Sequence, residues 1–556
     1  MQTKQTSNEK GLCVTKMNKS RKLIALLLSL AMAVSAAGCS SSDTKPEAPE
    51  TSSSKAQASG TVQDNTEAFR DIAGEKLFSE PVEISMMIPS HASWPYQEDW
   101  YVQNMIQEET NVTFHITSVT TDGFTDKVNL TMASGQLPDL IYFIGNAPII
   151  QYAPQGAFVN ILEHLDEMPN FKKWYEENQD FALNYLSADG GLYQFPEQGI
   201  EESNRRGWLY RKDVFDELGL AAPTNQEEFY EVLKSLKEAY PSSYPLAFRS
   251  FSNNMAQMVM LCPSWGTDYI DLTDNRYLRL DSKTNEWIFG PTEDHFKEML
   301  QFYNKLYEEK LLIPNFLTID TKGWQDVISN SEAFITVDYL SRIDFFNKPM
   351  RETDPDFTIA YMAPPSFGSG GLQQFSYSAK GIYGFAVSSQ CKQLDKVLTY
   401  IDWMYRDDTM ELLSWGREGE TFLEENGAKK WIDLNTTADI RKGTGLQTYG
   451  FYQRYDYSSE MATMSDEAIA AIEEARGFDL PQQPVLAFNE EENSIKDTIG
   501  NTISNYVAEQ TSKFILGERS FDTWDEYVRD IENFGLEQLK QIHEQSYARV
   551  MEQKHK

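Results

Sequence analysis

The feature that most constrains the fold is an alternation of strand-like and helix-like segments near the start of the globular part of the chain. Residues 82–88 (VEISMMI), 112–120 (VTFHITSVT) and 140–144 (LIYFI) are rich in apolar, β-branched and aromatic residues, which favours strands. A helix is expected at 101–109 between the first two strands, and another, containing 127–133, precedes the third. This order predicts an α/β fold with a parallel sheet and covering helices.

Open parallel sheets bind ligands beyond the carboxyl ends of their strands. The loops 89–96 and 145–148 follow two of the predicted strands and are therefore the expected rim of a binding site. Trp94 and Tyr96 lie in the first loop and flank Pro95, where a core ring would be unusual. We expect both rings to contact a ligand that is partly apolar and partly hydroxylated.

A second unit is expected after residue 196, because the globular part of the chain is longer than one hydrophobic core usually supports. Thr224 is predicted to cap a helix at 226–237, with Glu227 completing a capping box. Another short helix is expected at 213–218. Further strands are predicted at 208–210, 244–248, 333–337, 357–362 and 381–388.

The first 38 residues read as a targeting segment. Basic residues up to Lys22 precede an apolar run at 23–34, and Ser35-Ala36-Ala37-Gly38 lead into Cys39. The segment resembles the bacterial lipobox, which implies that the Cys39 thiol carries a diacylglycerol anchor. An uncleaved signal anchor or a secretory peptide cut near Ala37 are the alternatives. Residues 39–78 contain few large apolar side chains and are expected to form a flexible linker.

Charge and cysteine content narrow the class of protein. The formal net charge of −35 at pH 7 disfavours both binding to nucleic acid and a polybasic membrane-binding patch. Only Cys262 and Cys391 lie in the globular part, where one disulfide or two free thiols are both consistent with the sequence.

Several segments, taken together and in order, resemble the extracellular solute-binding proteins of ABC transporters, specifically the carbohydrate-binding family one lipoproteins common in Gram-positive bacteria. They are SGQLPDL (134–140), LYRKD (209–213), GFAVS (384–388), IDWMY (401–405), WGREGETF (415–422) and the segment from Trp524 to Tyr547.

The resemblance implies a periplasmic-binding-protein-like fold of two lobes, each with a mostly parallel sheet and covering helices, joined by crossing hinge strands. The expected N-lobe comprises 79–195 and 364–386, and the expected C-lobe 196–363 and 387–550. The crossings are expected near 194–199, 360–363 and 386–388. A ligand that contacts both lobes would favour a closed form.

The resemblance also implies a function. The chain is expected to be a monomeric, lipid-anchored receptor on the outer face of the cell membrane. It would capture a saccharide, in particular an oligosaccharide, and deliver it to ABC permease subunits. A sensory lipoprotein that presents ligand to a histidine kinase, and a binder of peptides or other solutes, remain as alternatives.

Enzymatic interpretations find little support. The sequence lacks G-x-x-x-x-G-K-[ST], H-E-x-x-H and G-x-S-x-G, and its six histidines lack metal-ligand spacing. Glycoside hydrolysis needs only two carboxylates. So acidic a chain contains such pairs in any case, and their presence therefore does not indicate a hydrolase. In alginate-binding relatives, the loop before the predicted strand at 244–248 resembles a calcium-binding EF-hand loop. In this chain the loop reads EAYPSS (238–243) and lacks alternating oxygen ligands, so no calcium site is expected there. We expect no enzyme activity, metal or cofactor.

The remaining candidate site residues follow from the resemblance. Asp338 and Tyr339 directly follow a predicted strand of the C-lobe, where family members place cleft residues. Tyr193, Trp265 and Trp415 are the other candidates for ligand contact, although Trp265 and Trp415 are equally consistent with packing. Three arginines, Arg205, Arg206 and Arg211, would either clamp a uronate carboxylate or form salt bridges between the lobes.

Overall fold

The computed structural model describes residues 76–199, 203, 205–249, 261–267, 278–281, 283–375, 382–480, 483–484 and 486–554. The predicted signal segment, Cys39 and nearly all of the predicted linker lie outside these residues. None of the helices in the described part of the chain is both long enough and apolar enough to cross a membrane.

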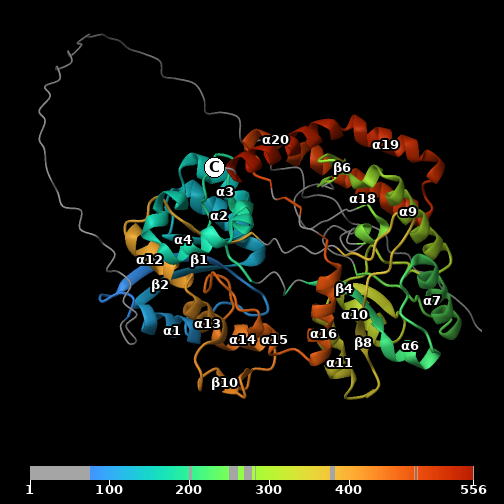
Figure 1. Cartoon of the computed structure of the whole chain (residues 1–556), viewed down its shortest axis with the longest axis horizontal. Helices are drawn as coiled ribbons and strands as arrows, with labels where there is room; N and C mark the ends of the chain where they lie inside the picture. The colour runs from blue at the N-terminus through green and yellow to red at the C-terminus, as the bar shows by residue number, and fades with distance from the viewer. Residues whose placement is uncertain are drawn as a thin grey trace, which may run out of the picture. The chain divides into compact units, whose positions relative to one another are not determined.

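The first sheet has four strands in the order β2-β1-β3-β9. Strand β1 (Val82–Ser90) pairs in parallel with β2 (Val112–Thr120) and with β3 (Leu140–Ile144), while β9 (Tyr383–Val387) is antiparallel to β3. Helices α1 (Tyr101–Thr110) and α2 (Thr121–Ser134) connect the parallel strands (Figure 1). The predicted β-α-β-α-β unit is therefore confirmed.

The side chains of this sheet alternate between two separate cores. Ile84, Met86 and Tyr142 pack in one core, whereas Met87 and Ile141 pack in the other. Because successive side chains of a strand point to opposite faces, a strand buried on both faces must be apolar along its whole length. This explains why β1 and β3 were recognisable in the sequence as continuous apolar runs.

The first core also contains residues far along the chain. Val397 and Ile401 of α12 (Leu394–Met404) and Tyr455 belong to it. The other helices here are α3 (Ala147–Tyr152), α4 (Pro169–Glu177), α5 (Gln179–Ala182), α13 (Asp407–Trp415), α14 (Thr437–Thr444) and α15 (Ser458–Met461), beside the hairpin β10 (Phe422–Glu425) and β11 (Ala428–Trp431). In Figure 1 the orange α12 to α15 accordingly surround the blue start of the fold.

This placement differs from the expected domain boundary. Residues 387–550 were assigned to the C-lobe, but residues up to Tyr455 pack with the first sheet. One cause is Asp402 of α12, whose carboxylate accepts hydrogen bonds from Phe171 N at 2.8 Å and Asn170 Nδ2 at 2.7 Å. These bonds cap the start of α4 and fix the two helices together.

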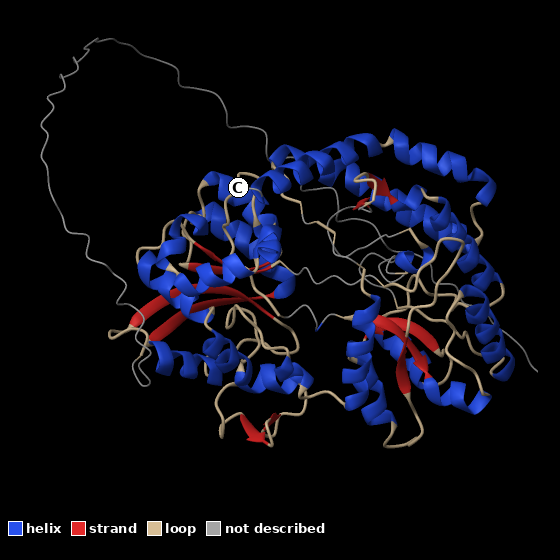
Figure 2. Cartoon of the chain, viewed as in Figure 1, coloured by secondary structure: helices blue, strands red, loops and turns tan. Residues whose placement is uncertain are grey.

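The second sheet has the order β7-β4-β8. Its strands are drawn red in Figure 2, with blue helices beside them. Strand β4 (Arg206–Arg211) is antiparallel to both β7 (Ile335–Tyr339) and β8 (Ile359–Met362), so the α/β class is confirmed but these pairings are not the parallel ones expected. A separate pair joins β5 (Leu278–Leu280) to β6 (Trp287–Phe289).

The predicted strand at 244–248 is reduced to isolated parallel bridges from Leu246 to Leu312 and Ile335. Pro245 explains the difference, because it has no amide N–H and cannot donate to a continuous ladder. Its carbonyl oxygen still accepts from the amides of Phe334 and Ile335.

The helices of the second core surround this sheet. Those before β9 are α6 (Lys212–Leu218), α7 (Gln226–Ala239), α9 (Asp294–Glu308), α10 (Thr321–Ser329) and α11 (Arg342–Met350). Those at the end of the chain are α16 (Asp466–Ala475), α17 (Glu490–Ile495), α18 (Asn501–Leu516), α19 (Trp524–Asn533) and α20 (Leu536–Lys554).

The predicted cap of α7 is displaced by one residue. Asn225 is the N-cap, and its side chain accepts from Glu228 N at 3.0 Å. Thr224 instead donates its backbone amide and its hydroxyl to the Glu228 carboxylate, both at 2.9 Å. The predicted Thr224–Glu227 pair is therefore wrong, because Asn225 holds the extended backbone conformation that an N-cap requires.

Three chain passages connect the two cores. One follows Phe195 and enters β4, one links β8 to β9, and one runs from Tyr455 to Ala468 of α16. The expected crossing at 386–388 instead lies in the first lobe, since Val387 pairs with Leu140.

Candidate functional site

A small pocket lies at the carboxyl end of β1. It is lined by Ile88, Pro89, Ser90, His91, Trp94, Tyr96, Trp100, Thr448 and Tyr449, and we call it the β1 pocket. Trp94 and Tyr96 were predicted from the loop after the first strand, and the structure brings them into this one pocket. Both side chains remain partly exposed.

Trp94 forms part of a layered group of rings and charge. Its ring stacks on His91, with centroids 3.7 Å apart and planes inclined by 14°. The guanidinium carbon of Arg441 lies 4.9 Å from the Trp94 ring centroid, within the range of a cation–π contact. These contacts hold the indole in one orientation.

Hydrogen bonds fix the loop that carries these rings. Tyr96 N donates to Ser90 Oγ at 3.0 Å, and the Tyr96 hydroxyl donates to Gln103 Oε1 at 3.1 Å. Trp100 Nε1 donates to the carbonyl oxygen of Lys442 at 3.0 Å. The loop is thereby tied both to its own helix α1 and to α14.

The electrostatics of the β1 pocket favour a neutral imidazole. Partial burial and, second, the positive charge of Arg441 lower the pKa of His91. Burial raises the pKa of Tyr96, so that its hydroxyl keeps its proton at neutral pH. The pocket therefore offers neutral rings and hydroxyl groups to a ligand.

The sequence prediction missed the part of the β1 pocket that comes from the segment after α14. Thr448 and Tyr449 line the pocket, and Arg441 contacts Trp94 from α14. The signal was the aromatic density of TYGFYQRYDY (448–457), which was not singled out. Because the segment 448–457 lies far along the chain from Trp94, the sequence did not indicate that the two lie together.

A buried carboxylate lies in the connection that leaves the first core. Glu197 is 1% exposed, and its Oε2 accepts from the Tyr142 hydroxyl at 2.6 Å. Burial, followed by the charge of Glu197, raises the pKa of Tyr142. Tyr449 lies against Tyr142 with ring centroids 5.6 Å apart, which links this buried group to the β1 pocket.

Asp338 and Tyr339 lie together at the end of β7, as predicted, but Asp338 is fully buried. Its carboxylate accepts from Arg249 Nε at 2.5 Å and from Arg342 Nε at 3.0 Å. The partly exposed Tyr339 is the more accessible of the pair, and its hydroxyl accepts from Arg206 at 2.6 Å. Asp338 thus positions arginines and does not itself face solvent.

Arg205 and Arg211 are engaged within the second lobe. Arg205 Nη1 pairs with Asp479 Oδ1 at 2.7 Å. Arg211 donates to both carboxylate oxygens of Asp213 and is almost completely buried. Their charges therefore stabilise the lobe itself, in place of the predicted uronate clamp or bridge between lobes.

Tyr193 and Trp415 lie away from the β1 pocket. The Tyr193 hydroxyl donates to Asp189 Oδ2 at 2.8 Å, and burial with this bond raises the pKa of Tyr193 to about 12. Trp415 is 2% exposed, stacks on Trp431 and donates from Nε1 to Asp456 at 2.9 Å. Such burial indicates a packing role for Trp415.

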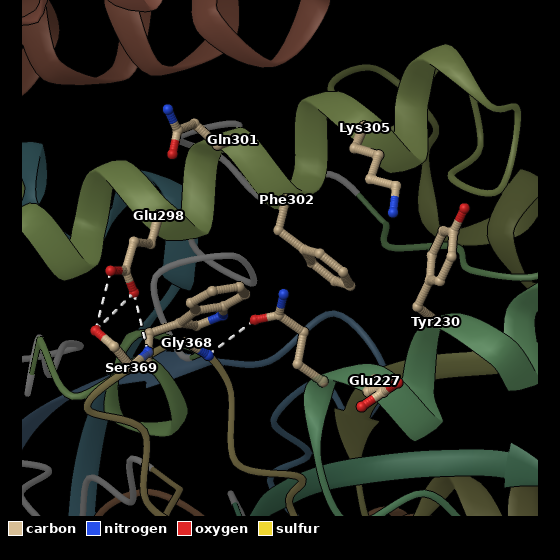
Figure 3. Close-up of a pocket in the computed structure, with 10 residues that line it drawn as sticks. Glu227, Tyr230, Glu298, Gln301, Phe302, Lys305, Gly368 and Ser369 are labelled. Atoms are coloured by element: carbon tan, nitrogen blue, oxygen red, sulfur yellow. Dashed lines mark hydrogen bonds between the residues drawn. The ribbon is translucent and has the colours of Figure 1, made fainter.

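Trp265 lines a different pocket, formed within the second lobe between α7 and α9 (Figure 3). We call this cavity of about 710 Å³ the α7–α9 pocket. Trp265 is only 1% exposed and stacks on Phe367 with ring centroids 5.1 Å apart. The structure therefore does not bring Trp265 together with Trp94.

Neither cysteine nor metal chemistry is evident at these sites. Cys262 and Cys391 are free thiols, which decides between the two states that the sequence left open. In the described part of the chain, no three His, Cys, Asp or Glu side chains cluster as metal ligands would.

The fold and these pockets can now be compared with known proteins. The family model of the bacterial extracellular solute-binding proteins matches residues 102–416. The chain belongs to this family. The resemblance expected from the sequence motifs is thereby confirmed, and the family is one of solute-binding proteins, not of enzymes.

Relatives cover most of this solute-binding chain. Lipoprotein LipO of Bacillus subtilis is 24% identical over 442 residues, which are 76% of this chain and 84% of LipO. FusA of Streptococcus pneumoniae, a fructooligosaccharide ABC transporter substrate-binding protein, is 23% identical over 478 residues, which are 80% of this chain and 85% of FusA.

A solved structure confirms the fold. The HMO-binding, ABC-transporter-associated solute-binding protein of Bifidobacterium longum infantis superposes with a TM-score of 0.71. The alignment covers 85% of this chain and 99% of that protein, at 17% identity. This likeness shows that the two proteins share the periplasmic-binding-protein-like architecture.

Proposed function

We propose that this chain is the substrate-binding component of an ABC importer, and that it captures an oligosaccharide and delivers it to the permease. The observation that carries the proposal is the β1 pocket, where stacked rings and hydroxyl groups gather at the carboxyl end of a parallel strand. FusA, which serves a fructooligosaccharide transporter, and the HMO-binding Bifidobacterium protein support the choice of a saccharide.

The β1 pocket itself holds only about 10 Å³, so a sugar would lie against its mouth, and the groups there suit one. The exposed parts of the Trp94 and Tyr96 rings would contact the C–H groups of a sugar ring, and Ser90, Thr448 and Tyr449 would bond to its hydroxyls. Tyr339 at the end of β7 is the proposed contact from the other lobe, in an orientation held by Arg206. Contacts from both lobes would favour a closed form of the receptor.

The proposal includes the location and state of the protein. A diacylglycerol on Cys39 would tether a monomer to the outer face of the cell membrane, since two acyl chains provide stable anchoring where one does not. The protein would bind and release its sugar without changing it. No partner other than the saccharide and the permease is needed for this role.

A saccharide panel tests the proposal. The purified protein, without its first 38 residues, would be heated with kestose, maltotriose, xylotriose, mannotriose, lacto-N-tetraose or a trigalacturonate. A saccharide that binds only the folded state raises the melting temperature, and chromatography of the same mixture should return it intact. Peptides of similar size provide the opposing panel. Stabilisation by a peptide and by none of the saccharides would contradict the proposal.

A further inference from the structure

The α7–α9 pocket lies entirely within the second lobe, apart from the β1 pocket. Its walls come from the first turn of α7, from one face of α9 and from the loop at Gly368 and Ser369. Its volume is within the range of about 300–1,000 Å³ that is typical of small-molecule sites. The proposed importer function does not use this pocket.

Hydrogen bonds hold one side of the pocket. Glu298 accepts from the amide of Ser369 at 3.0 Å and from its hydroxyl at 3.0 Å (Figure 3). The amide of Gly368 donates to Gln226 Oε1 at 2.9 Å. Gly368 has φ +66°, and a Cβ there would lie 2.7 Å from the Glu298 carboxylate and 3.0 Å from the Trp265 ring. Only glycine lets this loop lie so close to the wall.

An aromatic and cationic wall closes the other side. The Lys305 ammonium lies 3.5 Å from the centroid of the Tyr230 ring, and the Tyr230 hydroxyl donates to Glu309 at 2.7 Å. Figure 3 shows Phe302 extending from α9 into the space between Lys305 and the loop at Gly368. The walls of the pocket are therefore already in place in the absence of a ligand.

The polar groups of the pocket have mixed character. Glu227 and Glu298 supply carboxylate acceptors, Lys305 supplies a donor, and the carboxamides of Gln226 and Gln301 supply both. The carboxylates would repel an anionic ligand, and the ammonium would repel a cationic one. A neutral ligand with many hydroxyl groups can donate to the acids and accept from the lysine and the amides. The Phe302 and Tyr230 rings can contact its C–H groups.

We propose that the α7–α9 pocket is an accessory binding site for neutral saccharides, independent of the β1 pocket. Such a site would hold a neutral glycan chain against the receptor without lobe closure. Its affinity would depend on hydrogen bonds to Glu227 and Lys305, which lie on exposed parts of α7 and α9. Replacing both should therefore weaken binding by about tenfold or more.

Affinity electrophoresis tests the proposal on the folded protein. Native gels would contain inulin, pullulan, galactomannan, arabinoxylan or mixed-linkage β-glucan, with polygalacturonate as the acidic probe. We expect at least one neutral polysaccharide to retard the wild type and the Trp94→Ala variant equally. The Glu227→Ala/Lys305→Ala variant should lose this retardation while keeping the wild-type calorimetric affinity for the saccharide identified in the thermal panel.

A matched control removes the same two residue types elsewhere. Lys540 and Glu544 lie on α20, outside the α7–α9 pocket, so Lys540→Ala/Glu544→Ala should migrate as the wild type does. The proposal is overturned if no neutral polysaccharide retards the wild type, if Trp94→Ala abolishes the retardation, or if Glu227→Ala/Lys305→Ala is retarded normally. Retardation by polygalacturonate that requires Glu227 and Lys305 would overturn the neutral ligand class. The thermal panel reports separately on the importer proposal.

Discussion

At the scale of single residues, the Trp94 ring is already oriented in the absence of ligand. His91 covers one side of it and Arg441 contacts it from α14. A preorganised ring loses little conformational freedom when a ligand binds, so more of the contact energy appears as affinity. This is why a single aromatic side chain can be expected to dominate binding in the β1 pocket.

The Trp94→Ala variant tests this role. It should lose about 1–3 kcal/mol of binding free energy, which is roughly a 5- to 150-fold weaker affinity, because the stacking surface is removed. Isothermal titration with the saccharide from the thermal panel measures the change. Phe534 is an exposed ring on the second lobe, and Phe534→Ala should bind normally. Equal affinities of Trp94→Ala and the wild type would remove Trp94 from the site.

His91 should make stability depend on pH. Its folded-state pKa is lowered, so the unfolded chain binds a proton more readily, and stability falls as the pH drops below the ordinary value of about 6.5. The His91→Gln variant should lose less stability than the wild type between pH 7.5 and 5.5, as measured by urea unfolding. Identical losses in the wild type and His91→Gln would contradict the assigned environment.

The residues of the site were only partly predictable. Trp94 and Tyr96 follow from a simple rule about loops after parallel strands. Arg441, Thr448 and Tyr449 do not, because their position depends on how α14 packs in the first core. Asp338 was found at the right strand end, but its burial also depends on Arg249, which lies 89 residues away along the chain and which the local sequence around Asp338 does not relate to it.

At the scale of elements, strands buried on both faces were the most predictable. The bounds of β3 agree with the predicted segment, because a doubly buried strand must be apolar throughout. The bounds of β2, an edge strand whose side chains are mostly not buried, agree because its sequence is rich in β-branched residues. Residues 244–248 have a similar composition, yet Pro245 prevents a full ladder. The packing partner of α12 was not predictable, since an apolar helix face does not specify which sheet it covers.

Close contacts between strands also create a position that only glycine can occupy. Gly384 of β9 has φ +140°, and a Cβ there would lie 1.9 Å from the carbonyl oxygen of Phe195. This contact joins β9 to the start of the passage toward the second lobe. A side chain at Gly384 must therefore move one of these two backbones.

The Gly384→Ala variant should lower the free energy of unfolding by more than about 2 kcal/mol, through both steric overlap and backbone strain. The matched control is Gly135→Ala, where φ is +66° but no atom lies within 4 Å of the added Cβ. That change should cost only about 1 kcal/mol. Urea unfolding of both variants measures the difference. A Gly384→Ala variant no less stable than Gly135→Ala would show that the strands separate easily.

At the scale of the whole molecule, the proposed anchor would determine where the protein works. Only Cys39 can carry the proposed diacylglycerol, so Cys39→Ser should release the protein to the culture medium or block its processing. Fractionation of cells with an antibody to the folded domain measures the outcome. Normal retention of Cys39→Ser in the membrane fraction would contradict the lipid anchor.

The central claim is that two separately packed lobes close on a saccharide. A shift of the population from 1:99 to 99:1 in favour of the closed form needs about 5.5 kcal/mol of differential binding, which several hydrogen bonds and ring contacts made only in the closed form can provide. Small-angle scattering tests this claim most directly. The radius of gyration should decrease at saturating saccharide and return to its starting value when the saccharide is removed. An unchanged scattering profile, while calorimetry shows full binding, would contradict closure as the mechanism of capture.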